Sequence, residues 1–95
     1  MNDKVSILII GCGGHSRFVL DLVAKSNFEA FGLINLAETF DASEVIMGVP
    51  VIGCLSSIRD LYKSGHRNIA LGIGDNFKRE EIFFELKKIG FNFPN

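Results

Sequence analysis

The sequence has few of the features that mark membrane or secreted proteins. Its longest apolar run near the start, Val5 to Gly14, is about half the ~20 residues needed to span a bilayer. Only one basic residue, Lys4, precedes this run, and no small-x-small cleavage site follows it, so the run is not typical of a signal peptide. We therefore expect a cytoplasmic protein without a membrane partner.

Cysteines are few, and there is no excess of charge of either sign. The two cysteines, Cys12 and Cys54, are far apart and show no CxxC or Cys/His spacing suited to zinc. We expect no metal site and no disulfide, as in a reducing compartment. Ten Lys and Arg residues stand against eleven Asp and Glu residues, which gives a net charge of -1. Without a basic cluster, nucleic acid is not expected as a partner.

What is present is enough apolar surface for one small domain. The chain has 95 residues, of which 47% are hydrophobic and 22% are charged, with nine Phe and no Trp. A chain of this length should bury somewhat over ~60% of the surface that it exposes when unfolded. This composition excludes intrinsic disorder, because the apolar surface offsets the entropy of ordering. We therefore assign residues 1–95 to a single domain.

The hydrophobic pattern predicts a strand, a helix and a second strand in the first 35 residues. Residues Ile7 to Ile10 form a continuous apolar run rich in β-branched residues, which is typical of a strand covered on both faces. An apolar stripe at helical spacing predicts a helix from about Gly14 to Lys25. A strand follows from about Glu29 to Ile34. Together they form one βαβ unit, whose crossover should be right-handed.

The rest of the chain alternates less regularly. Residues 35–48 show no sustained period, and their structure is left open. Further along, the pattern predicts a short strand at 48–53, which Pro50 places at a sheet edge or a strand start. A helix should follow, capped by Ser56 or Ser57 and stopped by Gly65. The pattern then predicts a strand at 68–73, a helix from the Gly74-Asp75-Asn76 turn to about Lys88, and a short strand at 91–93. The predicted fold class is α/β, a small Rossmann-like doubly wound parallel sheet of four to five strands.

Three loops should converge beyond the carboxyl ends of the strands, where ligands of such sheets bind. They are Gly11-Cys12-Gly13-Gly14-His15, Asn35-Leu36 and Gly74-Asp75-Asn76. A glycine-rich turn at a helix start lets an anion approach the backbone N–H groups closely, so we expect an anionic ligand at the first loop. A tight turn without a ligand is the alternative there.

The glycine turn matches the dinucleotide fingerprint GxGxxG only in part, because Ser16 stands in place of the third glycine. At the end of the second strand, where an acid holds the ribose hydroxyls of NAD, this chain has Asn35. Ordinary NAD binding is therefore disfavoured. A Walker GxxxxGK[ST] motif is absent as well.

Four short motifs occur in an order and spacing that is fairly specific as a combination. They are Gly11-Cys-Gly-Gly-His15, Gly48-Val-Pro-Val-Ile-Gly53, Ile73-Gly-Asp-Asn76 with Arg79, and the ending Gly-Phe-Asn-Phe-Pro94. Together they resemble the N-terminal domain of the sialic acid O-acetyltransferase (NeuD) and PglD-type nucleotide-sugar acetyltransferases. The resemblance implies a Rossmann-like domain that holds a nucleotide sugar or sialic acid for polysaccharide biosynthesis. In that family a following left-handed β-helix of hexapeptide repeats trimerises, binds acetyl-CoA and carries the catalytic His.

The resemblance and the three loops together indicate a set of substrate-binding residues. The candidates are Gly11, Gly13, Gly14, His15, Asn35, Gly74, Asn76 and Arg79. No catalytic residue is assigned, because the chain shows no sustained six-residue period of a β-helix. We expect that domain to be absent from this chain, which should then have no cofactor of its own, no acetyltransferase activity and no means of forming the family trimer.

Alternatives accompany these assignments. Cys12 fits a small packing residue better than a nucleophile, and Asp75 and Asn76 also fit helix caps. Asn35-Leu36 replaces an acidic pair that is common in the family. The alternative function is a freestanding regulatory module that binds a nucleotide; an NAD-linked oxidoreductase is opposed by the missing ribose acid and the short length. The sugar, and the choice between O- and N-acetylation, are left open.

Overall fold

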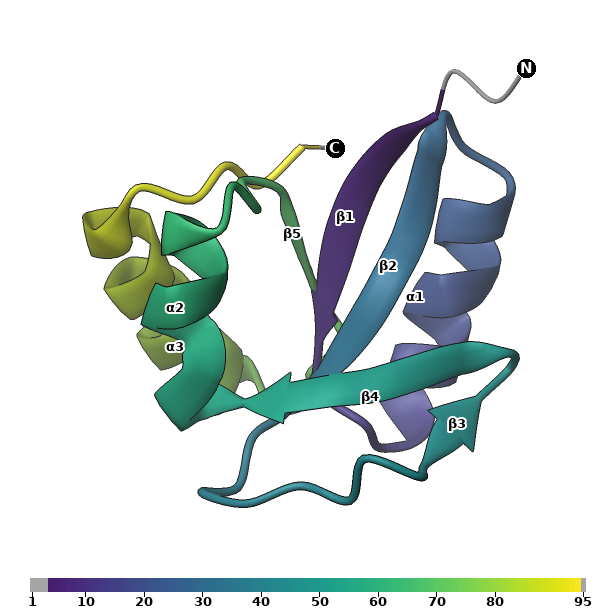
Figure 1. Cartoon of the computed structure of the whole chain (residues 1–95), viewed down its shortest axis with the longest axis horizontal. Coiled ribbons are helices and arrows are strands. Elements are labelled where there is room, and N and C mark those ends of the chain that lie inside the picture. The colour runs from purple at the N-terminus through teal and green to yellow at the C-terminus, as the bar shows by residue number, and fades with distance from the viewer. Residues whose placement is uncertain (1–3, 95) are drawn as a thin grey trace.

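A five-stranded sheet forms the centre of the molecule, which the computed structural model describes over residues 4–94 (Figure 1). The strands are β1 (Val5–Ile10), β2 (Phe28–Asn35), β3 (Val45–Ile46), β4 (Val49–Cys54) and β5 (Ile69–Leu71). Their order in the sheet is β3-β4-β2-β1-β5, and every neighbouring pair is parallel except β3 with β4. The predicted fold class and strand number are confirmed.

Helices cover both faces of this sheet, as expected of a doubly wound fold. They are α1 (Gly14–Ala24), the 3-10 turn η1 (Leu55–Ser57), α2 (Ile58–Lys63) and α3 (Asn76–Ile89). Figure 1 shows α1 on one side of β1 and β2, with α2 and α3 on the other. No helix within residues 4–94 is long and apolar enough to cross a membrane.

The apolar run of β1 explains why the sheet is buried on both faces. Leu8 and Ile10 join the hydrophobic cluster that includes residues of α2 and α3, whereas Ile7 and Ile9 join the cluster that includes residues of α1. Leu8, Ile9 and Ile10 are completely buried. Burial of each such side chain contributes roughly 1.5–3 kcal/mol. The strand thus packs against both helical layers, and its predicted cover on both faces is confirmed.

β4 agrees with the short strand predicted at 48–53, and Pro50 lies at its start, one of the two places that the sequence allowed. It lies beside β2, and β3 pairs with its first two residues, Val49 and Pro50. Pro50 precedes Val51, the first residue of β4 that pairs with β2, so its missing N–H costs no bond to β2. No pattern in the sequence predicted β3, because it lies in the segment 35–48, which has no hydrophobic period.

The elements after β4 follow the prediction in order but differ in detail. Ser57 is the N-cap residue of α2, one of the two serines predicted there, but its hydroxyl accepts the N–H of Cys54 at 3.3 Å and makes no capping bond to α2. β5 covers only Ile69–Leu71 of the strand predicted at 68–73. The strand predicted at 91–93 is reduced to a single bridge between Asn92 and Asn68.

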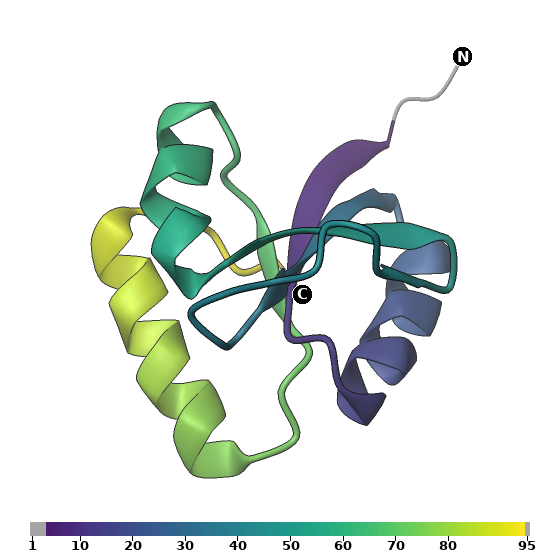
Figure 2. The same cartoon turned by 60° about the horizontal axis from the view of Figure 1, so that its bottom comes forward.

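The strand order places a topological switch point between β1 and β5. From β1 the chain adds β2 and then β4 in one direction, and it later returns to add β5 on the other side of β1. Ligands of open α/β sheets bind beyond the carboxyl ends of the strands at such a point. This end, here called the carboxyl end of the sheet, faces downward in Figure 1 and comes forward in Figure 2.

Candidate functional site

Gly11 is the structural part of the glycine turn. It follows β1 with a φ of 110°, a conformation that residues with a side chain rarely adopt. Its N–H donates to the carbonyl of Ile34 at 2.7 Å. A Cβ at this position would lie 2.6 Å from the carbonyl oxygen of Gly72. The packing of the turn therefore requires glycine here, whether or not a ligand binds.

Gly13 and Gly14 form the open part of the same turn. Both are exposed, and a Cβ at either position would meet no atom within 4 Å. Gly13 is the N-cap of α1, and no side chain among residues 4–94 caps the helix there. The first N–H groups of α1 therefore point outward at the positive end of the helix dipole. This is the geometry of an anion-binding turn.

Ser16 is the buried residue of the glycine turn. Its side chain is completely buried, and its N–H and Oγ both donate to the carbonyl of Gly13, at 3.1 and 2.5 Å. A Cβ at Gly72 would lie 3.0 Å from the Cα of Ser16. In the dinucleotide fingerprint the third glycine permits close packing of helix and strand. Here Ser16 takes that place and Gly72, which the sequence analysis did not single out, permits the close approach.

The turn from β5 to α3 lies beside the glycine turn. A Cβ at Gly74 would lie 3.7 Å from the Cβ of His15, so the two turns are in contact. His15 is exposed, and its ring centre lies 5.9 Å from that of Phe18. The structure thus brings together two of the three loops as the topology predicted.

Side chains close the start of α3. Asp75 is the N-cap, and its Oδ1 accepts a hydrogen bond from the N–H of Lys78 at 3.0 Å. The half-buried Arg79 donates to the carbonyl of Ile73 at 3.1 Å and to Oδ1 of Asn76 at 2.5 Å. The predicted capping role of Asp75 is confirmed. Contact of Arg79 or Asn76 with a ligand stays a prediction.

Asn35 occupies the carboxyl end of β2. Its half-buried side chain accepts a hydrogen bond at Oδ1 from the N–H of Ala37, at 2.9 Å, which forms an Asx turn. The preceding residue, Ile34, accepts the N–H of Gly11, so the end of β2 adjoins the glycine turn. The third loop is therefore at the predicted place, and its contact with a nucleoside stays a prediction.

The two cysteines have thiols of opposite character. Burial, and to a smaller extent the negative charge of Glu44, raises the pKa of the Cys12 thiol. Hydrogen bonds, led by that of the Ser56 hydroxyl, lower the pKa of Cys54. The Sγ of Cys54 donates to the carbonyl of Glu38 at 3.1 Å, and both thiols are free. A raised pKa disfavours a thiolate at Cys12, in agreement with the packing role expected for it.

Glu44 is the charged residue near the glycine turn that sequence reasoning missed. It lies nine residues beyond the end of β2, and its carbonyl accepts the N–H of Val51 at 2.9 Å as the chain enters β3. Its negative charge contributes to the raised pKa of the Cys12 thiol in the turn. The segment that carries it has no hydrophobic period, so the sequence held no signal for this approach.

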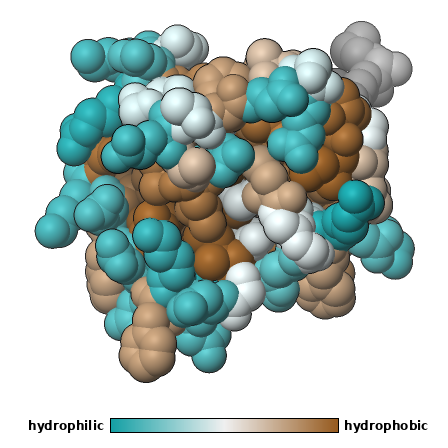
Figure 3. All heavy atoms as spheres, turned by 90° about the horizontal axis from the view of Figure 1, so that it is seen from below, coloured by the Kyte–Doolittle hydropathy of each residue, from teal (hydrophilic) through white to brown (hydrophobic). Residues whose placement is uncertain are grey.

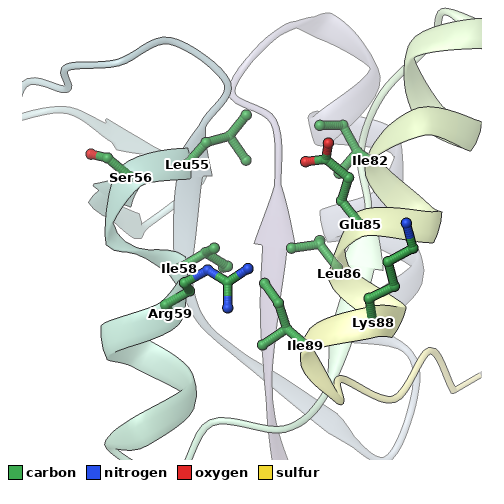
Figure 4. Close-up of a pocket in the computed structure, with 9 residues that line it drawn as sticks. All are labelled: Leu55, Ser56, Ile58, Arg59, Ile82, Glu85, Leu86, Lys88 and Ile89. Atoms are coloured by element: carbon green, nitrogen blue, oxygen red, sulfur yellow. The ribbon is translucent and has the colours of Figure 1, made fainter.

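A groove of about 440 Å3 lies apart from the glycine turn, between α2 and α3 (Figure 4). Its lining residues are Leu55, Ser56, Ile58, Arg59, Ile82, Glu85, Leu86, Lys88 and Ile89. Figure 4 shows apolar side chains from both helices facing one another, with Glu85 and Lys88 on the α3 side. Seen from the carboxyl end of the sheet, apolar surface lies between polar side chains (Figure 3). The groove includes no predicted substrate-binding residue.

Comparison with known proteins decides the family. A sequence model of the PglD N-terminal domain matches residues 6–86. The chain belongs to the PglD N-terminal domain family. The resemblance that its motifs indicated is therefore confirmed. No curated protein matches the sequence.

Solved structures share the fold of this PglD N-terminal domain. A mutant perosamine N-acetyltransferase from Caulobacter crescentus, in complex with CoA and GDP-perosamine, aligns with a TM-score of 0.79 and 26% identity, over 90% of this chain and 39% of that chain. The acetyltransferase domain of PglB from Neisseria gonorrhoeae, in complex with acetyl coenzyme A, aligns with a TM-score of 0.68 and 24% identity, over 93% and 41%. A UDP-D-quinovosamine 4-dehydrogenase from Vibrio fischeri aligns with a TM-score of 0.73 and 17% identity, over 97% of this chain and 80% of that chain. The last two comparisons show the fold alone.

The PglD N-terminal domain spans less than half of the two acetyltransferase chains to which it is similar. The alignments therefore leave more than half of each of those two chains unmatched.

Proposed function

We propose that this PglD N-terminal domain binds a nucleotide sugar at the carboxyl end of its sheet and positions it for acetylation. The carrying observation is the uncapped start of α1 at the switch point between β1 and β5, with Gly13 and Gly14 open to solvent. A diphosphate at this turn accepts hydrogen bonds from backbone N–H groups and lies at the positive end of the helix dipole. The neighbouring loops then face the nucleoside and the sugar.

Each predicted substrate-binding residue has a place in this proposal. Gly11 lets the glycine turn pack against Gly72, Gly74 lies beside His15, and Gly13 and Gly14 leave room for the phosphates. His15, exposed beside Gly74, contacts a phosphate or the sugar. The remaining three, at the end of β2 and the start of α3, are Asn35, Asn76 and Arg79.

The contribution of the domain to catalysis is positioning. In acetyl transfer, the amine or hydroxyl of the sugar attacks the thioester carbonyl of acetyl-CoA, a C–N or C–O bond forms, the C–S bond breaks, and CoA leaves as the thiol with the proton from the acceptor. The substrate-binding residues hold the nucleotide sugar, which is the acetyl acceptor, and holding two reactants in place can lower the barrier substantially. No proton transfer is assigned to them.

The ligand named for one similar structure favours a nucleoside-diphosphate-linked amino sugar. The perosamine N-acetyltransferase, at 26% identity, is in complex with CoA and GDP-perosamine. We therefore rank N-acetylation of such a sugar above O-acetylation of sialic acid. The proposal keeps the expectations of a cytoplasmic protein in polysaccharide biosynthesis, with acetyl-CoA bound and trimers formed by a further domain.

Calorimetric titration of the purified chain tests the proposal. GDP-perosamine, a UDP-linked amino sugar, CMP-sialic acid and NAD are titrated under one condition, with GDP, GMP and guanosine to isolate the contribution of the diphosphate. We expect a nucleotide sugar to bind and NAD to bind at least about tenfold more weakly, because no acid follows β2. Tighter binding of NAD, or no binding of any nucleotide, would contradict the proposal.

The same preparation tests the expected lack of activity. The purified chain of 95 residues, mixed with acetyl-CoA and the nucleotide sugar that binds best, should release CoA no faster than buffer does. Release above background would show that this domain carries an acetyl-transfer site, against the proposed role of positioning alone.

A further inference from the structure

Two asparagine side chains at the carboxyl end of the sheet are oriented by the protein itself. The Oδ1 of Asn35 accepts the N–H of Ala37 at 2.9 Å, and the Oδ1 of Asn76 accepts a guanidinium N–H of Arg79 at 2.5 Å. Within residues 4–94, no protein group accepts a hydrogen bond from the Nδ2 of either asparagine. Each amide therefore uses its oxygen internally and presents its nitrogen outward.

The chemistry of the partners fixes both orientations. A guanidinium and a backbone N–H only donate, so a rotated amide would set one donor against another at each position. Arg79 is itself held in place. Its guanidinium also donates to the carbonyl of Ile73 at 3.1 Å, and its backbone N–H donates to the carbonyl of Asp75 at 2.9 Å. The orientation of the Asn76 amide is therefore imposed by Arg79.

The two amides flank the glycine turn. Asn35 lies at the end of β2, whose Ile34 carbonyl accepts the N–H of Gly11. Asn76 begins α3, two residues after Gly74, which contacts His15. Donors from three elements, the two amides and the uncapped N–H groups of α1, therefore lie at one end of the sheet.

We propose that Asn35 and Asn76 read acceptor groups of the nucleotide sugar through their amide nitrogens, and that Arg79 is the positioning residue that sets the Asn76 amide. The inference rests on the proposed function and specifies its ligand chemistry. The acceptors are phosphate oxygens or carbonyl oxygens of the base, not the hydroxyl donors that an acid at the end of β2 would hold.

Replacement of asparagine by aspartate distinguishes the role of the amide oxygen from that of the amide nitrogen. In Asn76→Asp and Asn35→Asp, one carboxylate oxygen still accepts from Arg79 or Ala37, so the internal bond is retained. The outward group changes from a donor into a negatively charged acceptor. We expect each variant to bind GDP or UDP about tenfold or more weakly, because a hydrogen bond to a charged oxygen is lost and repulsion is added.

Asn27→Asp is the matched control. Asn27 is exposed, lies just before β2 at the opposite end of the sheet, and undergoes the same change of charge. It should bind GDP and UDP as the unchanged domain does. Guanosine and uridine identify the acceptor: a loss seen with the diphosphates alone indicates phosphate oxygens, and a loss seen also with the nucleosides indicates the base. Unchanged or tighter binding of nucleotides by both site variants would overturn the proposal.

The positioning role of Arg79 can be tested by melting temperatures in the absence of ligand. If Oδ1 of Asn76 faces the guanidinium, Asn76→Asp should leave the melting temperature unchanged or raise it, since a charged pair replaces a neutral one. In an Arg79→Met background the same change should be less favourable to the melting temperature than in the presence of Arg79, so a double-mutant cycle reports the coupling. Equal effects of Asn76→Asp in both backgrounds would overturn the positioning role.

Binding measurements complete the test of Arg79. Arg79→Met should weaken nucleotide binding severalfold, and Arg79→Lys, which retains one donor group, should restore part of that loss. If the unchanged domain binds no nucleotide, the proposed function fails while the coupling between Arg79 and Asn76 is still measured. If nucleotides bind and Asn76→Asp binds them equally well, the proposed function stands and this inference fails at Asn76.

Discussion

The two turns that meet at the switch point start their helices in opposite ways. At the start of α1 the N-cap is Gly13, and no side chain within residues 4–94 caps the helix. At the start of α3 the N-cap is Asp75, whose carboxylate accepts the N–H of Lys78, with Arg79 braced against Ile73. One helix start is left open at its backbone, and the other is completed by side chains.

This difference indicates which turn receives an anion. A helix start without a cap offers N–H groups and a partial positive charge, whereas an aspartate at the same place uses an N–H and adds a negative charge that opposes phosphate. Proximity to the carboxyl end of the sheet does not distinguish the turns, since they are in contact through Gly74 and His15. The distinction lies in the cap, and substitutions on either side can test it.

The largest effect is expected at Gly11, the structural glycine of the open turn. Gly11→Ala places a Cβ against the carbonyl of Gly72 and forces alanine to a φ of 110°. We expect a loss of roughly 3 kcal/mol in the free energy of unfolding. Urea titration followed by circular dichroism measures it. A stability equal to that of the unchanged domain would show that the turn relaxes without cost.

Gly13→Val separates ligand binding from folding in the same turn. The added side chain meets no protein atom within 4 Å at its Cβ, so the midpoint of urea unfolding should change little. It occupies the space of the phosphates, and affinity for GDP or UDP should fall about a hundredfold, as for the loss of two hydrogen bonds to a charged group.

Ala24→Val, at the exposed far end of α1, is the control for adding a β-branched residue to this helix. It should bind nucleotides normally. Retained affinity in a folded Gly13→Val variant would mean that the glycine turn is only a turn and that the comparison with α3 carries no functional meaning.

Asp75→Ala tests the closed turn. Loss of the cap at α3 should lower the free energy of unfolding by about 1 kcal/mol, which corresponds to a melting temperature lower by about 4–8 °C. Nucleotide affinity should be retained or slightly increased, because a negative charge near the site is removed. A large loss of affinity instead would assign Asp75 to the ligand, and the contrast between the turns would have to be abandoned.

The smallest effect concerns Asp41, in the loop that follows β2. Hydrogen bonds from the hydroxyl and the N–H of Ser43, at 2.6 and 2.9 Å, lower the pKa of its carboxyl group. Because the pKa is lower in the folded state, the ionised carboxylate stabilises the fold at pH values above the unfolded pKa. This stability is lost below about pH 4, as the pH falls through the folded pKa. Asp41→Asn should slightly reduce this acid-dependent loss in melts between pH 2 and 6, and an unchanged profile would contradict it.

The sequence predicted the parts of this fold that local pattern determines. The run at Ile7–Ile10 indicated a central strand because only a strand covered on both faces is apolar throughout, and the glycines at 65 and 90 end α2 and α3 where expected. The position of the three loops followed from the order of strands and helices. These features depend on neighbours within a few residues along the chain.

What the sequence did not predict depends on distant contacts. Gly11 and Gly13 are indistinguishable in the motif, and only the approach of Gly72, sixty-one positions along, makes the first one structural. The antiparallel β3 and the approach of Glu44 to Cys12 arise in a segment without a period. The internal bond from Arg79 to Asn76 has a spacing of three residues, which was available in the sequence but was interpreted only as ligand chemistry.

The two borders of the sheet restrict how copies of this domain can associate. On one side β3 pairs with Val49 and Pro50 of β4, and the carbonyl of Glu44 accepts the N–H of Val51 at 2.9 Å. On the other side, Asn92 donates its N–H to the carbonyl of Arg67 at 2.7 Å and accepts the N–H of Ile69 at 2.8 Å beside β5. A long unpaired border would invite strands of another chain and hence aggregation. Short and partly covered borders direct self-association of this domain to side-chain surfaces instead of a continuous intermolecular sheet.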